Sequence, residues 1–297
     1  MADQPSLPRE EYIEQEYFFR IYRERLLEGM PSQDILKTVH EEILATTRLP
    51  MAIDFMRTEI LHNGRISDAM ERLAHYFTPF QTYVLNRAED EVARFDQVTG
   101  LEILEREAKF RSESASMPGL FVYQFECLAR NRLGYGDGLG AMAADSAYDE
   151  RWRKWIRGLR ANLGAYELSE LVFRASQHYL TLRSSHPGKV EAASSDDAAA
   201  TGLFDEQAGR IAKANVGRDP LHFFAALQRQ LGYPQIPQTR RVHDETLSPM
   251  LEGRLLKIEQ RLKIVELEQK GGIDLTKFYK TEDSDVPPAF RDDPELN

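Results

Sequence analysis

One short pattern occurs twice in the sequence, and each copy has the features of a junction between two helices. The first copy is "NGRISDAM", which contains Gly64 and Ser67, and the second is "GAYELSEL", which contains Gly164 and Ser169. Glycine readily adopts the left-handed conformation that ends a helix, and serine is a preferred N-cap of the next helix. The copies lie about a hundred residues apart, a period that predicts an internal duplication of a helical unit.

Helical periodicity surrounds both junctions. Apolar residues recur three or four positions apart, which is the spacing of an amphipathic helix, and no stretch shows the alternation of a strand. Each copy is predicted to contain four helices, and Gly29 and Gly134 are expected to end the first helix of their copies. Ser32 is expected to cap the next helix of the first copy. That copy continues into a long helical stretch with an expected interruption near Thr99 and Gly100.

The predicted architecture is all-α, with two similar helical bundles followed by a helical hairpin and a short coiled-coil-like helix. A Ser-, Ala- and Asp-rich stretch after the second bundle is typical of a flexible linker, and the acidic C-terminal stretch is typical of a disordered segment. The predicted segments are a disordered N-terminus at 1–9, helical bundle repeat 1 at 10–116, helical bundle repeat 2 at 117–182, a flexible linker at 183–202, a helical hairpin at 203–233, an extended connector at 234–249, a coiled-coil-like helix at 250–270 and an acidic disordered tail at 271–297.

Composition excludes several classes of protein. The net charge of −10 argues against general nucleic-acid binding, because neutralising phosphates needs an excess of Lys and Arg. A single cysteine, Cys127, excludes an intrachain disulfide framework and favours a reducing compartment. The sequence shows neither a signal peptide nor an apolar run long enough to span a membrane. A cytoplasmic protein without a membrane span is therefore expected.

Candidate chemical motifs are few, and each has a simpler structural interpretation. Glu59 and His62 form an E-x-x-H pattern, but a di-iron bundle needs that pattern twice together with two further acids. The glycine-rich stretch that begins at Gly134 lacks the strand and the GK[ST] sequence of a phosphate-binding loop. The sequence therefore predicts no catalytic residue, no cofactor and no metal site, and we expect a protein that is not an enzyme.

The most basic stretch of the chain is "RWRKWIRGLR". Its tryptophans, Trp152 and Trp155, share one helical face with apolar neighbours, which predicts that they are core residues. The opposite face carries bases that are either solvated or in contact with an anionic surface. These basic residues are Arg151, Arg153, Lys154 and Arg157.

A second candidate interaction segment lies near the C-terminus. Its apolar residues alternate four and three positions apart, as the core positions of a coiled coil do. The helix is predicted either to pair with a second copy of the chain or to dock on its own chain. The candidate oligomerisation residues are Leu251, Leu255, Ile258, Leu262 and Val265.

Several of these motifs resemble the cytoplasmic helical domains of the type II secretion system protein F and type IV pilus platform family. "LLEGMPSQDIL", with Gly29, resembles the first turn of that domain, and "NGRISDAM", with Gly64, Ile66 and Ser67, resembles its junction. Glu89 is similar to the glutamate of a Gly-Glu stretch, and "GAYELSEL" resembles the junction of a second copy. Family members follow each copy with transmembrane helices, which this sequence lacks. The resemblance covers at most residues 10–182 and implies a soluble relative.

The expected function is that of a non-enzymatic cytoplasmic protein-interaction scaffold, with protein partners and self-association. The resemblance implies a role in a secretion or pilus-like assembly. Two alternatives remain open. One is a general helical adaptor or regulatory module unrelated to secretion, and the other is a metal-binding helical-bundle enzyme that would use Glu59 and His62.

Overall fold

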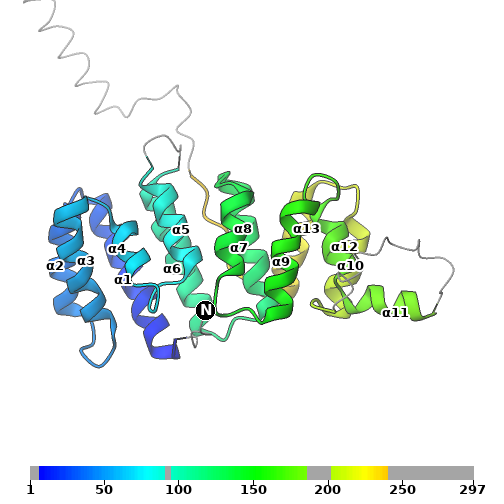
Figure 1. Ribbon diagram of the computed structural model, residues 1–297, viewed down its shortest axis with the longest axis horizontal. Helices are drawn as coiled ribbons and strands as arrows, with labels where there is room; N and C mark the ends of the chain where they lie inside the picture. Colours follow the sequence, from blue (N-terminus) through cyan, green and yellow to red (C-terminus); the bar gives the residue numbers. More distant parts are fainter. Residues whose placement is uncertain (1–6, 91–94, 186–201, 240–297) are drawn as a thin grey trace, which may run out of the picture. The chain divides into compact units, whose positions relative to one another are not determined.

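The computed structural model describes residues 7–90, 95–185 and 202–239 (Figure 1). Within these residues the protein is all-helical, which confirms the predicted fold class. The helices are α1 (Arg9–Leu27), α2 (Ser32–Glu42), α3 (Leu49–Asn63), α4 (Ile66–Arg72), α5 (Pro79–Ala88), α6 (Gln97–Ser112), α7 (Met117–Asn131), α8 (Tyr135–Ala143), α9 (Glu150–Asn162), α10 (Leu168–Arg174), α11 (Gln177–Ser185), α12 (Glu206–Asn215) and α13 (Pro220–Leu231).

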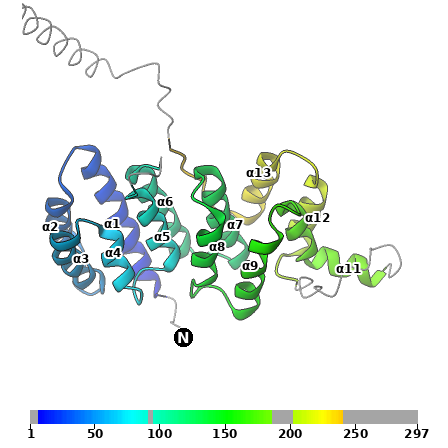
Figure 2. The same cartoon turned by 45° about the horizontal axis from the view of Figure 1, so that its top comes forward.

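The helices pack as two sets, and in each set the first helix lies against the last. In the first set α1 packs against α6, and α2 to α5 pack one against the next between them. In the second set α7 packs against α8 and α13 (Figure 2). In addition, α8 packs against α9, and α12 packs against α10 and α13. Contacts of α5 with α8 and of α6 with α7 join the two sets. The order of contacts differs between the two sets, because α2 to α5 pack consecutively whereas α10 packs against α12. The internal duplication stays a prediction.

The four glycines expected at helix ends all have backbone conformations that favour glycine. Gly29, Gly64, Gly134 and Gly164 have φ values of +83°, +72°, +96° and +104°. Gly64 is the C-cap of α3, and its N–H donates to the carbonyl of Ile60 at 3.0 Å. A side chain at these φ values is strained, so glycine is favoured at these turns. Gly134 does not end α7 as predicted, because the left-handed C-cap of α7 is Arg132 and Gly134 precedes α8 as its N-cap residue.

The predicted starts of α2 and α6 were wrong. Ser32 is the first residue of α2 rather than its N-cap, and its helix starts without a side-chain cap. Thr99 and Gly100 lie inside the first turn of α6, so the interruption comes earlier, between α5 and α6. The reason is Asp96, whose carboxylate accepts a hydrogen bond from the N–H of Thr99 at 2.7 Å and so starts a new helix there.

The predicted N-caps Ser67 and Ser169 are the second residues of α4 and α10. At α4 the cap comes from another helix end, because the carboxylate of Glu89 accepts from the N–H groups of Ile66 at 2.8 Å and Ser67 at 3.0 Å. A carboxylate is favoured there by the positive end of the helix dipole. Both junctions therefore lie where the sequence places them, but neither serine is the N-cap that begins its helix.

The core of the second set is aromatic. Phe121 of α7 lies 4.8 Å from the ring of Trp155 and 5.6 Å from that of Trp152, and Phe204 packs against the same rings. The two tryptophans are buried, which confirms that this face of α9 belongs to the core. Aromatic clusters of this kind bury large areas with defined ring geometry.

Residues 233–239 cross α6 and α7 in an extended conformation. The hydroxyl of Tyr233 donates to Glu126 at 2.7 Å, and the amide of Asn131 donates to the carbonyl of Pro237 at 3.0 Å. Arg106 of α6 donates to the carbonyl of Gln235 at 2.5 Å. We call these residues the C-terminal strap. In the described part of the chain no helix is both long and apolar enough to cross a bilayer.

Candidate functional site

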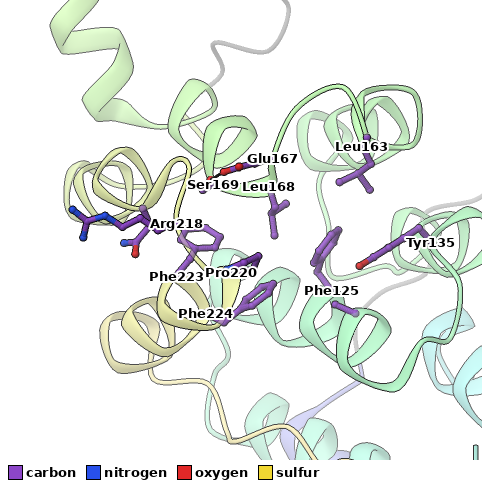
Figure 3. Close-up of a pocket in the computed structure, with 13 residues that line it drawn as sticks. Phe125, Tyr135, Leu163, Glu167, Leu168, Ser169, Arg218, Pro220, Phe223 and Phe224 are labelled. Carbon is purple, nitrogen blue, oxygen red and sulfur yellow. Dashed lines mark hydrogen bonds between the residues drawn. The ribbon is translucent and has the colours of Figure 1, made fainter.

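An apolar cavity of about 440 Å³ lies beside the second helix junction (Figure 3). Its walls come from α7 and the start of α8 on one side, and from α10 and the α12–α13 turn with α13 on the other. The residues that line it are Phe125, Ala129, Tyr135, Leu163, Gly164, Glu167, Leu168, Ser169, Asn215, Arg218, Pro220, Phe223 and Phe224. This volume lies in the range of natural ligand pockets, which are mostly apolar with a few polar groups. We call this cavity the junction pocket.

Aromatic rings form most of the pocket wall. Phe125 stacks on the ring of Tyr135 at 5.4 Å and on that of Phe224 at 6.4 Å. Leu168, the first residue of α10, points toward Phe125 and Phe224 across the cavity (Figure 3). Gly164 holds the chain in a turn with φ +104°, which places Leu163 on one side of the cavity and Leu168 on another. The geometry of this wall is therefore set by the second of the two similar helix junctions.

Polar groups of the pocket are concentrated at its edge. One carboxylate oxygen of Glu167 accepts from the hydroxyl of Ser169 at 3.1 Å and from the N–H of Gly217 at 2.8 Å. These bonds tie the α9–α10 turn to the α12–α13 turn. Arg218 is exposed, and its guanidinium points away from the phenyl rings (Figure 3). Glu167 therefore connects the two turns at the edge of the pocket. The guanidinium of Arg218 is the cation at this edge.

Exposed apolar side chains lie next to the lining residues. Tyr135 lines the pocket and is 45% exposed, Tyr166 is 40% exposed, and Val216 and Leu221 are 43% and 51% exposed. Tyr166 lies between the lining residues of the α9–α10 turn, and the other two adjoin those of the α12–α13 turn. An apolar cavity whose edge also exposes large apolar groups is typical of a site that another molecule covers.

A buried ionic network lies away from this pocket. Arg111 of α6 forms ion pairs with Glu107 and Asp145, and all three side chains are at most 4% exposed. Gln124 of α7 donates to Glu107 at 2.7 Å and to Asp145 at 3.3 Å, and it accepts from the hydroxyl of Tyr148 at 2.7 Å. Burial, with a smaller contribution from Asp145, raises the pKa of Glu107 against the opposing effect of Arg111. This network joins the two helix sets and is enclosed, so it serves the fold.

The E-x-x-H pair lies near the end of α3, where His62 is exposed. Glu59 forms an ion pair with Arg72 of α4 at 2.8 Å. Among the residues that the structure describes, no group of three or more potential ligands is placed to hold a metal ion. Cys127 is fully buried, and burial raises the pKa of its thiol well above the usual value.

The basic residues of α9 lie on the face opposite its tryptophans. Arg151, Lys154 and Arg157 are exposed, and Arg153 is half-buried. Arg157 is 3.7 Å from Glu150 of the same helix, a distance typical of a weak surface pair. The candidate oligomerisation residues from Leu251 to Val265 lie outside the described residues.

Sequence reasoning found the second junction but missed the pocket beside it. Gly164 and Ser169 line the pocket, although the sequence pattern predicted only a helix junction at this place. The aromatic residues of α7 and α13 follow helical periodicity in the sequence. This periodicity identifies the buried face of each helix, but it does not show where two buried faces pack incompletely and leave a cavity. Comparison with known proteins gave no match to any protein-family model, curated protein or solved structure.

Proposed function

We propose that the protein is a non-enzymatic protein-interaction scaffold and that the junction pocket binds a side chain of its partner. The observation that carries this proposal is the combination of an aromatic cavity with exposed apolar residues at its edge. Buried anchor residues in a pocket supply most of the binding energy in protein interfaces. The volume suits one or two large apolar side chains, and the exposed apolar residues at the edge suit the segment that carries them.

Site-specific photo-crosslinking tests this proposal. A photo-reactive phenylalanine analogue replaces Tyr166 beside the pocket in the full chain, and the same analogue replaces Leu61 of α3 as the control. Leu61 is 66% exposed and belongs to the other helix set. In the cells that produce the protein, we expect a discrete crosslinked partner from position 166 and none of it from position 61. The same adducts from both positions would refute the assignment of the pocket.

A matched pair of variants checks the result without the photo-reactive residue. Leu221→Asp places a charge at the edge of the pocket, and Leu61→Asp places the same charge on α3. Neither side chain is part of the buried core, so both variants should fold as the unchanged protein does. The amount of partner recovered with the protein should fall for Leu221→Asp and stay unchanged for Leu61→Asp. Equal recovery from both variants would contradict the proposal.

A narrower proposal places the scaffold in a secretion or pilus-like assembly in the cytoplasm. It is supported by the residues that carry the resemblance, because Glu89 contacts the N–H groups of Ile66 and Ser67 just after Gly64. Mass spectrometry of the crosslinked partner tests it. An assembly ATPase or a platform protein is the expected partner, and an unrelated regulatory protein would instead make this a general adaptor.

A further inference from the structure

Helix α13 forms one wall of the junction pocket, and hydrogen bonds hold the chain at both of its ends. Phe223 and Phe224 of this helix line the cavity. Before the helix begins, the N–H of Gly217 donates to Glu167 at 2.8 Å. After the helix ends, the chain passes through a single glycine into the C-terminal strap, whose first residue is Tyr233. The position of this wall therefore depends on the segments that flank the helix.

The hydroxyl of Tyr233 connects the two helices that carry facing aromatic walls. It lies 2.7 Å from a carboxylate oxygen of Glu126 in α7 and 3.0 Å from the carbonyl oxygen of Phe224 in α13. Glu126 follows Phe125, and the rings of Phe125 and Phe224 stack at 6.4 Å in the pocket. Burial, together with the negative charge of Glu126, raises the pKa of Tyr233, so the hydroxyl keeps its proton. One buried donor thus joins α7 to α13 beside the rings that line the cavity.

The strap is fastened to α7 and α6 by groups that lie outside the pocket lining. Arg130 donates to the other carboxylate oxygen of Glu126 at 2.5 Å, which holds this acceptor in place on α7. Asn131 of α7 and Arg106 of α6 donate to backbone carbonyls of the strap at 3.0 Å and 2.5 Å. The strap therefore ties the α13 wall to a support that does not depend on what occupies the cavity.

We propose that the C-terminal strap holds the α13 wall of the junction pocket in position, and that Tyr233 is the positioning residue through which it acts. With the strap in place, Phe224 stays at a fixed distance from Phe125, so the pocket is formed before a partner arrives. Without it, the partner has to order α13 on binding, and that ordering weakens the affinity. This inference rests on the proposed function and adds what keeps the pocket competent to bind.

Removal of one hydroxyl tests the effect on the wall in the full-length protein without a partner. Tyr233→Phe keeps the ring and deletes the donor. The matched control is Tyr76→Phe in the other helix set, because both tyrosines are 3% exposed and the hydroxyl of Tyr76 donates to Glu11 at 3.0 Å. In hydrogen–deuterium exchange, the amides of α13 should exchange about fivefold faster in Tyr233→Phe, the factor expected for one ordinary hydrogen bond.

The control separates this effect from a general loss of stability. Tyr76→Phe should leave the exchange of α13 unchanged. If α13 exchanges at the same rate in Tyr233→Phe as in the unchanged protein, the proposal is overturned. Equal acceleration of all helices of the second set would overturn it as well, because the hydroxyl would then stabilise the whole set rather than position one wall.

Capture of the partner tests the consequence for binding. The photo-reactive residue at position 166 is combined with each tyrosine variant, and the crosslinked partner is quantified below saturation. We expect about fivefold less of it from Tyr233→Phe and an unchanged amount from Tyr76→Phe. Faster exchange of α13 with unchanged capture would sink this inference and leave the proposed function standing. If even the unchanged protein captures no specific partner, the proposed function fails, and the exchange of α13 still decides whether the strap positions this wall.

Asn131→Ala loosens the strap while leaving Tyr233 in place. It removes the donor to the strap carbonyl and the acceptor of the Thr239 N–H at 3.2 Å. The exchange of α13 should rise and the capture should fall, as with Tyr233→Phe. Unchanged values in both measurements would make Tyr233 an isolated contact and overturn the role of the strap. Circular dichroism confirms that each variant is folded.

Discussion

Replacement of Arg111 by methionine isolates the energetic role of the buried ionic network. Methionine keeps an unbranched stem of similar length but removes the guanidinium that pairs with Glu107 and Asp145. Asp145 would then keep the N–H of Ala147 at 3.0 Å and the amide of Gln124 at 3.3 Å as donors, without a counter-charge. An uncompensated buried charge costs about 3–5 kcal/mol. Glu107 loses the same counter-charge, while its burial already raises its pKa and favours its neutral form.

Guanidinium chloride denaturation followed by circular dichroism measures this cost. We expect Arg111→Met to lower the free energy of unfolding by about 3 kcal/mol or more. The control is Arg57→Met, because Arg57 pairs with Asp54 where the side chains are 45% and 55% exposed. That pair should contribute less than about 1 kcal/mol.

A double-mutant cycle identifies the cause. Adding Asp145→Asn to Arg111→Met removes the orphaned charge, so the double variant should lose less stability than the sum of the two single changes. A cost of Arg111→Met as small as that of Arg57→Met would refute the reasoning. So would strict additivity, because it would show that the loss comes from packing rather than from an unpaired carboxylate.

Three further predictions concern individual side chains. The raised pKa of Glu107 means that the folded state keeps a proton that the unfolded state loses, so the free energy of unfolding should fall as pH rises above the ordinary glutamate pKa. Glu107→Gln should flatten that slope in denaturation curves recorded across pH. Glu89→Ala should cost about 1–2 kcal/mol through loss of the α4 cap, whereas Ser67→Ala should be neutral or stabilising, because the buried Ser67 hydroxyl has no hydrogen bond within the described residues. Thermal unfolding separates these two variants, and equal losses would restore Ser67 as the cap. Cys127 should react with a thiol reagent only upon unfolding, since it is fully buried and its thiol pKa is raised; rapid labelling of the native protein would contradict this.

Local patterns sufficed to predict the all-helical fold class and the glycine turns, but not the starts of α2, α4, α6 and α10. Apolar spacing identified the buried faces, including Trp152 and Trp155, and glycine identified the turns, because both effects act within a few residues. The cap of α4 escaped prediction because its acceptor, Glu89, lies on a different helix end. Proximity of that kind exists only after α4 packs against α5.

The candidate site was less accessible to sequence reasoning for the same physical reason. Phe125 and Phe224 are apolar residues on helices far apart in the chain, and nothing in either helix shows that they meet around a gap. The buried pair of Arg111 and Asp145 likewise joins α6 to the turn before α9. A sequence pattern indicates which residues avoid water, whereas the complementarity of facing surfaces determines where packing is incomplete.

The C-terminal strap has a consequence for the order in which the protein folds. Its hydrogen bonds join Gln235 to Arg106 and Tyr233 to Glu126, over sequence separations of 129 and 107 residues. Contacts this distant form late, because the entropy of closing a long loop must be overcome first. During synthesis α6 and α7 leave the ribosome well before the strap. The surface of α6 and α7 that the strap covers therefore stays exposed to water until residues 233–239 have been synthesised. A ribosome that pauses before this point would hold a nascent chain in which this surface is still solvated.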